Sequence, residues 1–140
     1  RLTLESGGKT AVAPEALPVA HGADLRLRLR LRLAPHLGPV RVQVVVWNHE
    51  LHAVMDVIGP DSAGFLLAPD PTGLHELEAV IPRLMLNGGR HTLTVVVTEP
   101  DASVVHCRHD NAGIVSMGVH FLSGANLIVP AEWRRVRPGA

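Results

Sequence analysis

The sequence has 140 residues and a formal net charge of zero at pH 7. This length suits a single domain with a substantial hydrophobic core, and the balanced charge argues against a nucleic-acid-binding protein, which usually carries a basic excess. No apolar run approaches the roughly 20 residues of a membrane-spanning helix, and no signal-peptide pattern is present.

The chain starts at Arg1 rather than at a methionine, and we expect it to be a piece of a longer protein. Cys107 is the only cysteine of the sequence, so no disulfide can form within it, which fits a reducing compartment. Aromatic residues are scarce, with two Trp, two Phe and no Tyr. We therefore expect few aromatic platforms for a ligand.

The first 21 residues show little periodicity. Leu2 to Glu5 alternate briefly and predict an edge strand. From Ser6 to Gly22 the composition changes to Gly, Pro, Ala and Ser, which is typical of a surface loop. We interpret residues 1–21 as an edge strand and a linker-like loop that precede the main domain.

The stretch from Leu25 to Leu33 reads LRLRLRLRL and alternates without a break. A period of two places the leucines on one face of a strand and the arginines on the other, so the leucines require a core. Successive arginines stand about 7 Å apart along a strand and repel one another by roughly 0.6 kcal/mol in water. This favours either a solvated face paired with acids on a neighbouring strand, such as Glu76 and Glu78, or a stripe that binds an anionic partner.

The chain continues with further strand-like segments, separated by turn signals such as Asn87-Gly88-Gly89. Phe65 to Gly73 has turn chemistry around a short apolar stretch, and Asp110 to Gly113 joins the last two long strands. The strand-like segments are Val40–Asn48, His52–Ile58, His75–Ile81, Thr92–Thr98, Val104–His109, Ile114–Phe121 and Asn126–Val129.

This spacing predicts an all-β fold, namely an antiparallel immunoglobulin-like or jelly-roll β-sandwich of about eight strands. We expect the sandwich to occupy residues 22–134 and a flexible tail to follow at 135–140. The expected core consists of Leu27, Leu29, Leu31, Val44, Leu93, Val95, Val119 and Phe121.

Common enzyme motifs are missing, since the sequence has no phosphate-binding Gly-rich loop, no G-x-S-x-G and no H-E-x-x-H. The nine histidines raise the question of a metal. His49 and His52 are three residues apart, as are His106 and His109, and on a strand this spacing puts the two side chains on opposite faces. Cys107 and His109 do share a face. We expect no metal site, no other cofactor and no catalytic residue.

Trp47 lies near the end of the predicted strand Val40–Asn48, beside Asn48 and His49. If Val44 faces the core, then Gln43 and Trp47 face outward. An outward tryptophan suits a sugar, because an aromatic face can stack on the apolar face of a pyranose. The alternative is that a loop or a second subunit covers it, which the continuous VVVW run favours. We expect Trp133, by contrast, to plug the end of the core.

The candidate carbohydrate-binding residues are Trp47, Gln43, Arg28, Arg30 and His120. They form a shallow groove with donors, an acceptor and one aromatic ring if the strands that carry them are neighbours. Arginine can grip paired hydroxyls, a carboxylate or a phosphate with its fork of donors. If this face does not bind, the next candidate is the far sheet around Arg108 and His106.

Three segments of the chain resemble a known family, the C-terminal carbohydrate-binding domain of the ATPase subunit of O-antigen polysaccharide ABC transporters (the Wzt type). They are Leu77–Leu93 (LEAVIPRLMLNGGRHTL), the strand Ile114–Phe121, and Gly124–Trp133 (GANLIVPAEW). Gly22-Ala23-Asp24, ahead of the long alternating strand, also fits the family pattern.

The resemblance implies a non-catalytic module that binds the finished end of a lipid-linked polysaccharide and so selects chains for export. It also implies a homodimer, at times formed by exchange of a terminal strand. The transporter's nucleotide-binding domain would lie upstream in the same full-length chain, and the module would act in the cytoplasm, at the inner face of the membrane.

Two other classes of function remain open. One is a structural immunoglobulin-like spacer. The other is an accessory or dimerisation sandwich of a glycan-modifying enzyme, such as a glycosyltransferase, without a ligand of its own. The sequence that precedes Arg1 distinguishes them, because an ATPase signature there supports the transporter and a transferase domain supports the enzyme.

Overall fold

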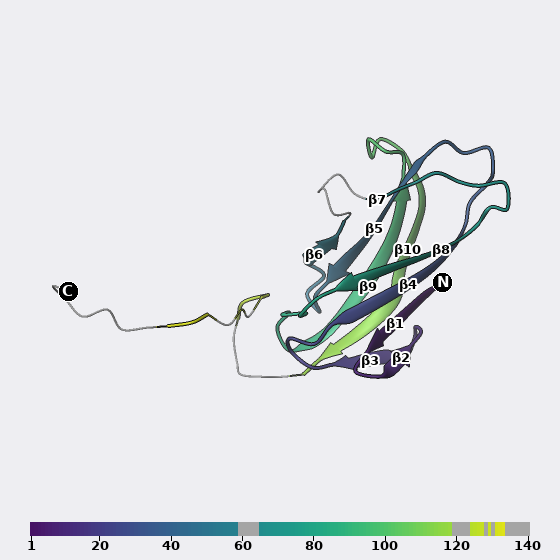
Figure 1. Ribbon diagram of the computed structural model, residues 1–140. Coiled ribbons are helices and arrows are strands. Elements are labelled where there is room, and N and C mark those ends of the chain that lie inside the picture. The colour runs from purple at the N-terminus through teal and green to yellow at the C-terminus, as the bar shows by residue number, and fades with distance from the viewer. Residues whose placement is uncertain (59–64, 119–123, 128, 130, 134–140) are drawn as a thin grey trace, which may run out of the picture.

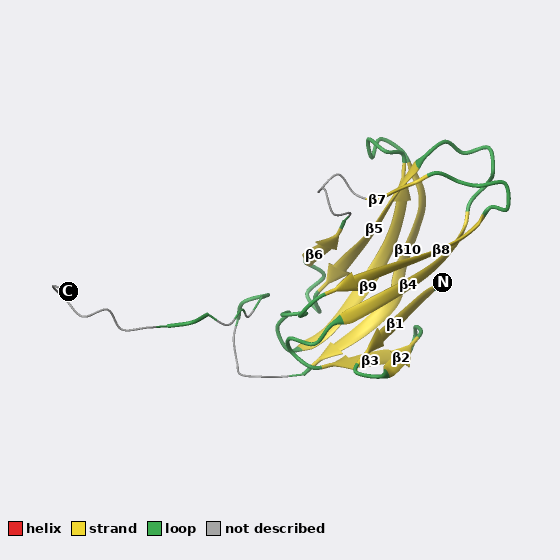
Figure 2. Ribbon diagram, in the orientation of Figure 1, coloured by secondary structure: helices red, strands yellow, loops and turns green. Residues whose placement is uncertain are grey.

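The computed structural model describes residues 1–58, 65–118, 124–127, 129 and 131–133. These residues form ten β-strands in two packed sheets, and Figures 1 and 2 show one sheet lying in front of the other. The predicted all-β sandwich is confirmed, with two more strands than expected. The described part of the chain contains no helix long and apolar enough to cross a membrane.

The smaller sheet has four strands in the order β2-β1-β4-β8. It contains the alternating leucine–arginine stretch, which forms β4 and pairs antiparallel with β8 over its whole length. The alternation predicted from the sequence is confirmed, because the leucines of β4 face the second sheet while its arginines face outward. The strands are β1 (Leu2–Ser6), β2 (Lys9–Ala11), β4 (Leu25–Arg32) and β8 (Leu74–Ile81).

The larger sheet has six strands, with β3-β10-β9-β5-β6 in order and β7 also paired to β5. All neighbours in it are antiparallel except β3 and β10, which run parallel. The strands are β3 (Ala16–Val19), β5 (Val40–Trp47), β6 (Ala53–Val57), β7 (Phe65–Leu67), β9 (Gly89–Thr98) and β10 (Val105–Met117).

The hydrophobic core lies between the sheets and is built mainly from leucine and valine. Leu31 is only partly buried, whereas Val119 and Phe121 lie outside the described residues. The other predicted core residues are buried, and these are Leu27, Leu29, Val44, Leu93 and Val95. The face assignment that made this prediction is therefore confirmed for both sheets.

The N-terminal region was expected to be an edge strand and a loop, and the structure corrects both points. β1 lies inside its sheet, between β2 and β4. The segment Ser6 to Gly22 contains the short strands β2 and β3, whose Ala11, Leu17 and Val19 join the core. Strands of three or four residues give too few repeats for a period of two to stand out, and here their pairing comes from partners distant in sequence.

The last two long strands were expected to be joined by a turn at residues 110–113, but β10 runs through this segment as one strand. Its register against β9 shifts between His109 and Gly113, and Asn111 has a φ of 52°. The polar residues that predicted a turn instead form a bulge, which bends a strand without ending it.

The C-terminal expectations are corrected as well. Trp133 is 93% exposed and does not plug the core. The predicted closing strand at Asn126–Val129 appears in the described residues as one isolated bridge between Leu127 and Leu86. Figure 1 shows that this part of the chain leads away from the sandwich, so Trp133 has no core to fill.

Candidate functional site

The outer face of the six-stranded sheet holds one aromatic ring among polar side chains. Alternation along β5 turns Gln43, Val45 and Trp47 outward, where they are half-buried, and the register places Val96 and Thr94 of β9 opposite Gln43 and Val45. Val45 and Val96 thus form a small apolar floor on the face of the sheet. The predicted outward orientation of Gln43 and Trp47 is confirmed.

A chain of hydrogen bonds fixes Trp47 at one end of this floor. Its indole Nε1 donates to Oγ1 of Thr94 over 3.0 Å, and that hydroxyl donates to Oδ1 of Asp110 over 3.0 Å. Arg108 donates to the same carboxylate oxygen over 2.9 Å, and its guanidinium carbon lies 6.0 Å from the centroid of the Trp47 ring. The indole is therefore held in one orientation by residues of the two strands β9 and β10.

The electrostatics of this cluster favour an ionised carboxylate. The hydrogen bond from Arg108 and then that from Thr94 lower the pKa of Asp110 below its usual value. Arg108 neutralises this carboxylate and also lies at cation–π distance from the tryptophan ring. The cluster thus joins a charged pair to an aromatic ring on an exposed surface.

A second polar pair borders the floor from the other side. The amide Nε2 of Gln43 donates to Oδ2 of Asp56 over 2.6 Å, and Asp56 lies opposite Val45 in the pairing of β6 with β5. We call the whole assembly the Trp47 platform. It consists of Gln43, Val45, Trp47, Asp56, Thr94, Val96, Arg108 and Asp110.

Arg28 and Arg30 lie on the opposite outer face of the molecule, as part of the four-stranded sheet. The predicted groove that combines them with Trp47 and Gln43 is wrong, because β4 and β5 follow one another in the chain but belong to different sheets. The loop between these strands, which contains Pro35 and Pro39, crosses from one sheet to the other.

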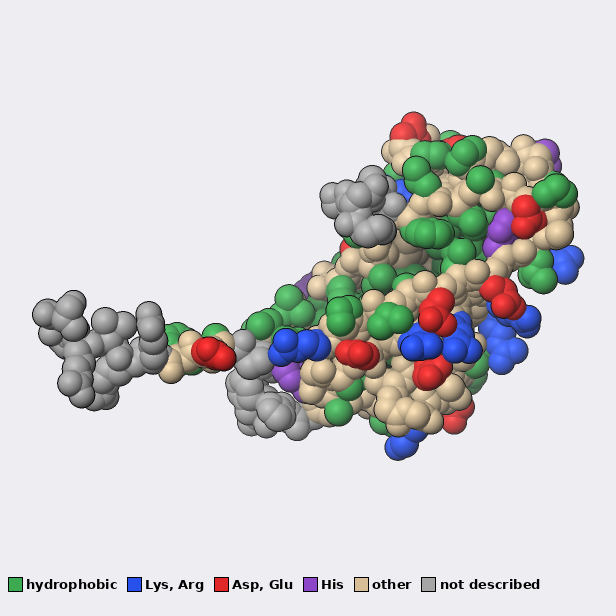
Figure 3. Space-filling model, in the orientation of Figure 1, with side chains coloured by type: hydrophobic (Ala, Val, Ile, Leu, Met, Phe, Trp, Pro, Cys, Tyr) green, Lys and Arg blue, Asp and Glu red, His purple; other side chains and the backbone are tan. Residues whose placement is uncertain are grey.

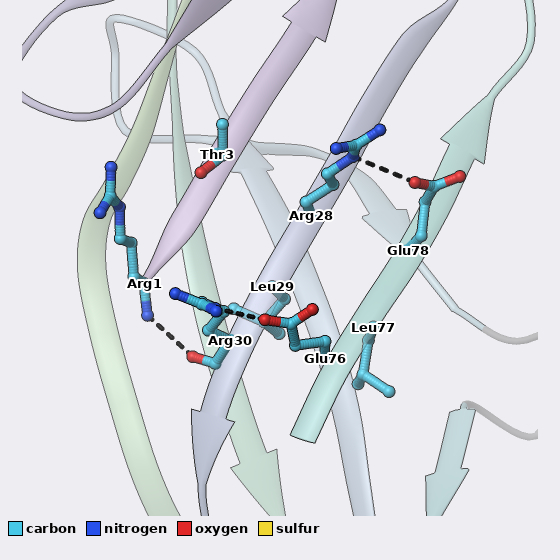
Figure 4. A pocket seen from close by; sticks show the side chains of 8 residues that line it. All are labelled: Arg1, Thr3, Arg28, Leu29, Arg30, Glu76, Leu77 and Glu78. Carbon is cyan, nitrogen blue, oxygen red and sulfur yellow. Dashed lines mark hydrogen bonds and ion pairs between the residues drawn. The ribbon is translucent and has the colours of Figure 1, made fainter. Parts of the chain in front are cut away.

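The arginine row of β4 is paired with acids on β8, as one of the two interpretations predicted. Arg28 lies opposite Glu78 and donates to it over 3.1 Å, and Arg30 lies opposite Glu76 and donates to it as well (Figure 4). These side chains are 45–63% exposed, so each pair contributes at most about 1 kcal/mol to stability. They line a shallow hollow of about 470 Å³.

A larger hollow of about 540 Å³ opens between the two sheets at the edge formed by β8. Figure 3 shows hydrophobic side chains beside the row of charged ones on this side of the molecule. Ile58, Phe65 and Val80 at this opening are 39%, 41% and 49% exposed. The apolar residues that line it include Val57, Ile58, Phe65, Leu77, Ala79 and Val80.

The remaining candidates add little to the site. His120 lies outside the described residues. Among the residues that the structure does describe, no three His, Cys, Asp or Glu side chains come together as a possible metal site. His106, named with Arg108 as the next candidate, pairs instead with Glu99 at 3.0 Å.

Three polar residues of the platform were not predicted from the sequence: Asp56, Thr94 and Asp110. Thr94 is 2% exposed, and it stands on the outward side of β9 between two inward residues, which was visible in the alternation. Its contact with Trp47 and Asp110 required the order β10-β9-β5 in the sheet, which no local pattern shows. Asp110 was in addition assigned to a turn.

Comparison with known proteins yields a likeness in structure but none in sequence. No model of a known protein family matches the chain, and no curated protein matches its sequence. The solved C-terminal domain of Wzt has a similar structure, with a TM-score of 0.67 over 96% of this chain and 81% of that one. The Wzt-type resemblance is confirmed for the fold. Sequence identity is 10%, so this likeness extends to the fold alone.

Proposed function

We propose that this domain is a non-catalytic carbohydrate-binding module that recognises an O-antigen-like, lipid-linked polysaccharide and couples it to export by an ABC transporter. The observation that carries the proposal is the oriented ring of Trp47, held by Thr94 and flanked by Arg108. The similarity in fold to the C-terminal domain of Wzt supports the same function.

The chemistry of the Trp47 platform suits a sugar. A pyranose has an apolar face of C–H groups and an edge of hydroxyls, so it requires an apolar surface next to planar donors and acceptors. Val45, Val96 and the Trp47 ring supply the apolar surface. The amide–carboxylate pair of Gln43 and Asp56 and the guanidinium–carboxylate pair of Arg108 and Asp110 supply fixed polar groups on two sides. Polar groups that are already oriented bind at a lower entropic cost.

The opposite face provides the matched control for this proposal. Arg28 and Arg30 are neutralised by Glu78 and Glu76, and no aromatic residue lines the hollow beside them. Arg28 and Arg30 were also predicted to bind the glycan. Because they lie on the face opposite the Trp47 platform, they contact the glycan only if it also binds to the four-stranded sheet. His120 stays a predicted contact.

The test is a calorimetric titration of the protein with the polysaccharide of its own host. Trp47→Ala is expected to weaken binding at least tenfold, or about 1.4 kcal/mol, and Arg30→Ala to leave it within twofold. Each variant is first checked for an unchanged unfolding transition. Equal binding by the parent and by folded Trp47→Ala contradicts the proposal, and selective loss in Arg30→Ala moves the site to the four-stranded sheet.

We propose further that the domain forms a homodimer and acts behind a nucleotide-binding domain of the same full-length chain, at the cytoplasmic face of the membrane. Exposed apolar residues support the dimer, both at the opening beside β8 and in the C-terminal segment. In the latter, Leu127, Val129 and Trp133 are 53%, 65% and 93% exposed. Sedimentation is expected to show a dimer at tens of micromolar protein, and a monomer contradicts it.

The same apolar opening favours a second candidate function, an accessory or dimerisation domain of a glycan-modifying enzyme without its own ligand. Exposed apolar patches commonly mark protein interfaces. This alternative predicts a dimer that binds no glycan, whereas the leading proposal predicts that Trp47-dependent glycan binding accompanies the dimer.

A further inference from the structure

We infer that Arg41 forms an anion-binding subsite at one end of the Trp47 platform, where it binds a carboxylate or a phosphate of the polysaccharide. This inference rests on the proposed function, because it names a chemical group on the ligand of the same surface. It follows from the position of Arg41 in the outward row of β5 and from its guanidinium, whose buried Nε has no hydrogen-bond partner.

Arg41 shares its face of the sheet with the Trp47 platform. Alternation along β5 turns Arg41 outward together with Gln43 and Trp47, which follow it by about 7 Å and 20 Å along the strand. The neighbour of Gln43 on β9 is Val96, so Arg41 borders the end of the apolar floor at Val96. A linear glycan that runs along β5 from the Trp47 ring over this floor therefore reaches Arg41.

The side chain of Arg41 is half-buried, and the described residues around it supply no acceptor for its Nε. Its neighbours across the sheet are Leu66 of β7, which has an apolar side chain, and Thr98 of β9. The hydroxyl of Thr98 donates to the backbone carbonyl oxygen of Glu99. Unlike Nε, the terminal nitrogens Nη1 and Nη2 of Arg41 are not buried, and they are the donors that an anionic ligand can reach.

Arg30 and Arg108 show by contrast how a guanidinium is paired in this domain. Arg30 on the four-stranded sheet donates to Glu76, and Arg108 on the platform donates to Asp110. Arg41 forms no such pair within the part of the chain that the structure describes. Its positive charge is therefore available to an anion from outside the domain.

The acids on and beside the platform are bound to other groups. They pair as Asp56 with Gln43, Asp110 with Arg108, and Glu99 with His106. Asp56 lies opposite Val45, four residues or about 14 Å along β5 from Arg41. Because each of these carboxylates has its own partner, the place beside Arg41 is left for a carboxylate or a phosphate of the ligand.

A guanidinium that is partly removed from water gains more from an anion than from an uncharged hydroxyl. Its N–H groups form a planar fork that fits the paired oxygens of a carboxylate or a phosphate, and the opposite charge adds an attraction that a hydroxyl does not supply. Burial of Nε has already removed hydration from Arg41, so less water remains to be displaced when an anion binds. Arg41 is therefore expected to favour an acidic or phosphorylated glycan over an uncharged one.

The test is a calorimetric titration with three samples of the host polysaccharide. One is left untreated, one has its carboxylates reduced to alcohols, and one has its phosphate esters cleaved. We expect one of the two treatments to weaken binding by the wild-type domain about tenfold or more, because it removes a charge-assisted hydrogen bond. The treatment that acts identifies the source of the anion, and the difference is expected to shrink at high salt.

Four variants locate the cation that is responsible. Arg41→Gln removes the charge and keeps a planar amide, so it is expected to bind the untreated polysaccharide about tenfold more weakly and to lose the response to treatment. Arg41→Lys keeps the charge without the fork and is expected to fall in between. Arg90→Gln removes an exposed arginine at the other end of the same face, and Arg32→Gln removes one from the opposite face. Both are expected to bind within twofold of the wild type.

Each variant is first checked for an unchanged unfolding transition, and the outcomes are distinct. Weaker binding by Arg41→Gln, together with its loss of response to treatment, supports the inference. If Arg41→Gln binds like the wild type while Trp47→Ala does not, if Arg90→Gln alone loses binding, or if neither treatment affects the wild type, the inference is overturned and the glycan-binding function stands. If the wild type does not bind the untreated polysaccharide, the proposed function fails and the inference fails with it.

Discussion

The two outer faces of the sandwich are built in different ways. On the four-stranded sheet, the arginines of β4 pair directly with acids on the neighbouring strands: Arg30 pairs with Glu76 of β8, and Arg28 pairs with Glu78 of β8 and with Glu5 of β1. On the six-stranded sheet, the Trp47 platform takes its residues from β5, β6, β9 and β10. The first face is a solvated surface whose charges neutralise one another, whereas the second fixes an aromatic ring beside polar pairs.

This difference teaches that a dense row of charge does not mark the better site. The arginine row is the most conspicuous feature of the sequence, yet each of its exposed ion pairs is weak. The platform has a single tryptophan and scattered polar residues, which are ordinary in sequence and become a unit only when the strands are ordered.

The two faces share one core, and truncating it gives the largest expected effect. Leu29→Ala in the four-stranded sheet and Leu93→Ala in the six-stranded sheet are each expected to lower the free energy of unfolding by about 2–5 kcal/mol, because Leu29 is 6% and Leu93 is 0% exposed. Urea unfolding followed by circular dichroism measures both. A loss below 1 kcal/mol at either residue contradicts the packing described for that sheet.

The second-largest loss of stability is expected on the six-stranded sheet, where hydrogen bonds hold Trp47. Thr94→Val removes the hydroxyl that joins the indole to Asp110 and leaves the half-buried indole donor unpaired, so stability is expected to fall by about 1–3 kcal/mol. Thr92→Val, on the same strand and face, is the matched control, with a smaller expected loss. If the two variants unfold alike, the hydrogen-bond chain does not hold Trp47.

The core beneath the larger face also predicts a dependence on pH. Burial lowers the pKa of His91, whose ring Nδ1 lies 3.2 Å from the carbonyl oxygen of Gly89. The unfolded chain binds a proton at His91 near the usual pKa of about 6.5, whereas the folded one does so only at lower pH, so stability falls as pH drops below about 6.5.

The free energy of unfolding measured between pH 7.5 and 5.5 should therefore drop more in the wild type than in His91→Gln. His52→Gln is the control, because the side chain of His52 is 70% exposed. An equal pH dependence in the wild type and His91→Gln argues against a buried neutral imidazole.

The smallest effect is expected on the four-stranded face. Arg30→Ala removes an exposed ion pair with Glu76 and should change the free energy of unfolding by less than about 1 kcal/mol, with the difference reduced further at high salt. Thermal unfolding at low and high salt measures it. If Arg30→Ala lowers the free energy of unfolding as much as Leu29→Ala does, the arginine row is essential to the fold, and its description as a solvated surface is wrong.

Sequence reasoning was most successful where the signal was local and repeated. The alternation of β4, β5 and β9 gave both their strands and their buried faces, from Leu27 to Val95. It was wrong where pairing is non-local or short, as in β2, β3 and the bulge of β10. The loop chemistry around Asn111 is the same for a turn and for a bulge, and only the neighbouring strand distinguishes them.

The same contrast between local and non-local signals applies to the candidate site. The outward orientation of Trp47 and Gln43 followed from parity along one strand. Parity along a strand could not show that Trp47 and Gln43 lie on a different sheet from Arg28 and Arg30. Two consecutive strands can pair with each other or can belong to different sheets, and loops that contain proline occur in both cases. The contacts with Asp56 and Asp110 depend on the sheet order, which is set by packing across the whole domain.

The most direct test of the central claim uses the fact that the chain has only two tryptophans, Trp47 and Trp133. In Trp133→Phe, all tryptophan emission comes from the platform; in Trp47→Phe, it comes from the C-terminal segment. Titration with the host polysaccharide is expected to give a saturable change in emission for Trp133→Phe and none for Trp47→Phe. A saturable change seen only in Trp47→Phe contradicts glycan binding at the Trp47 platform.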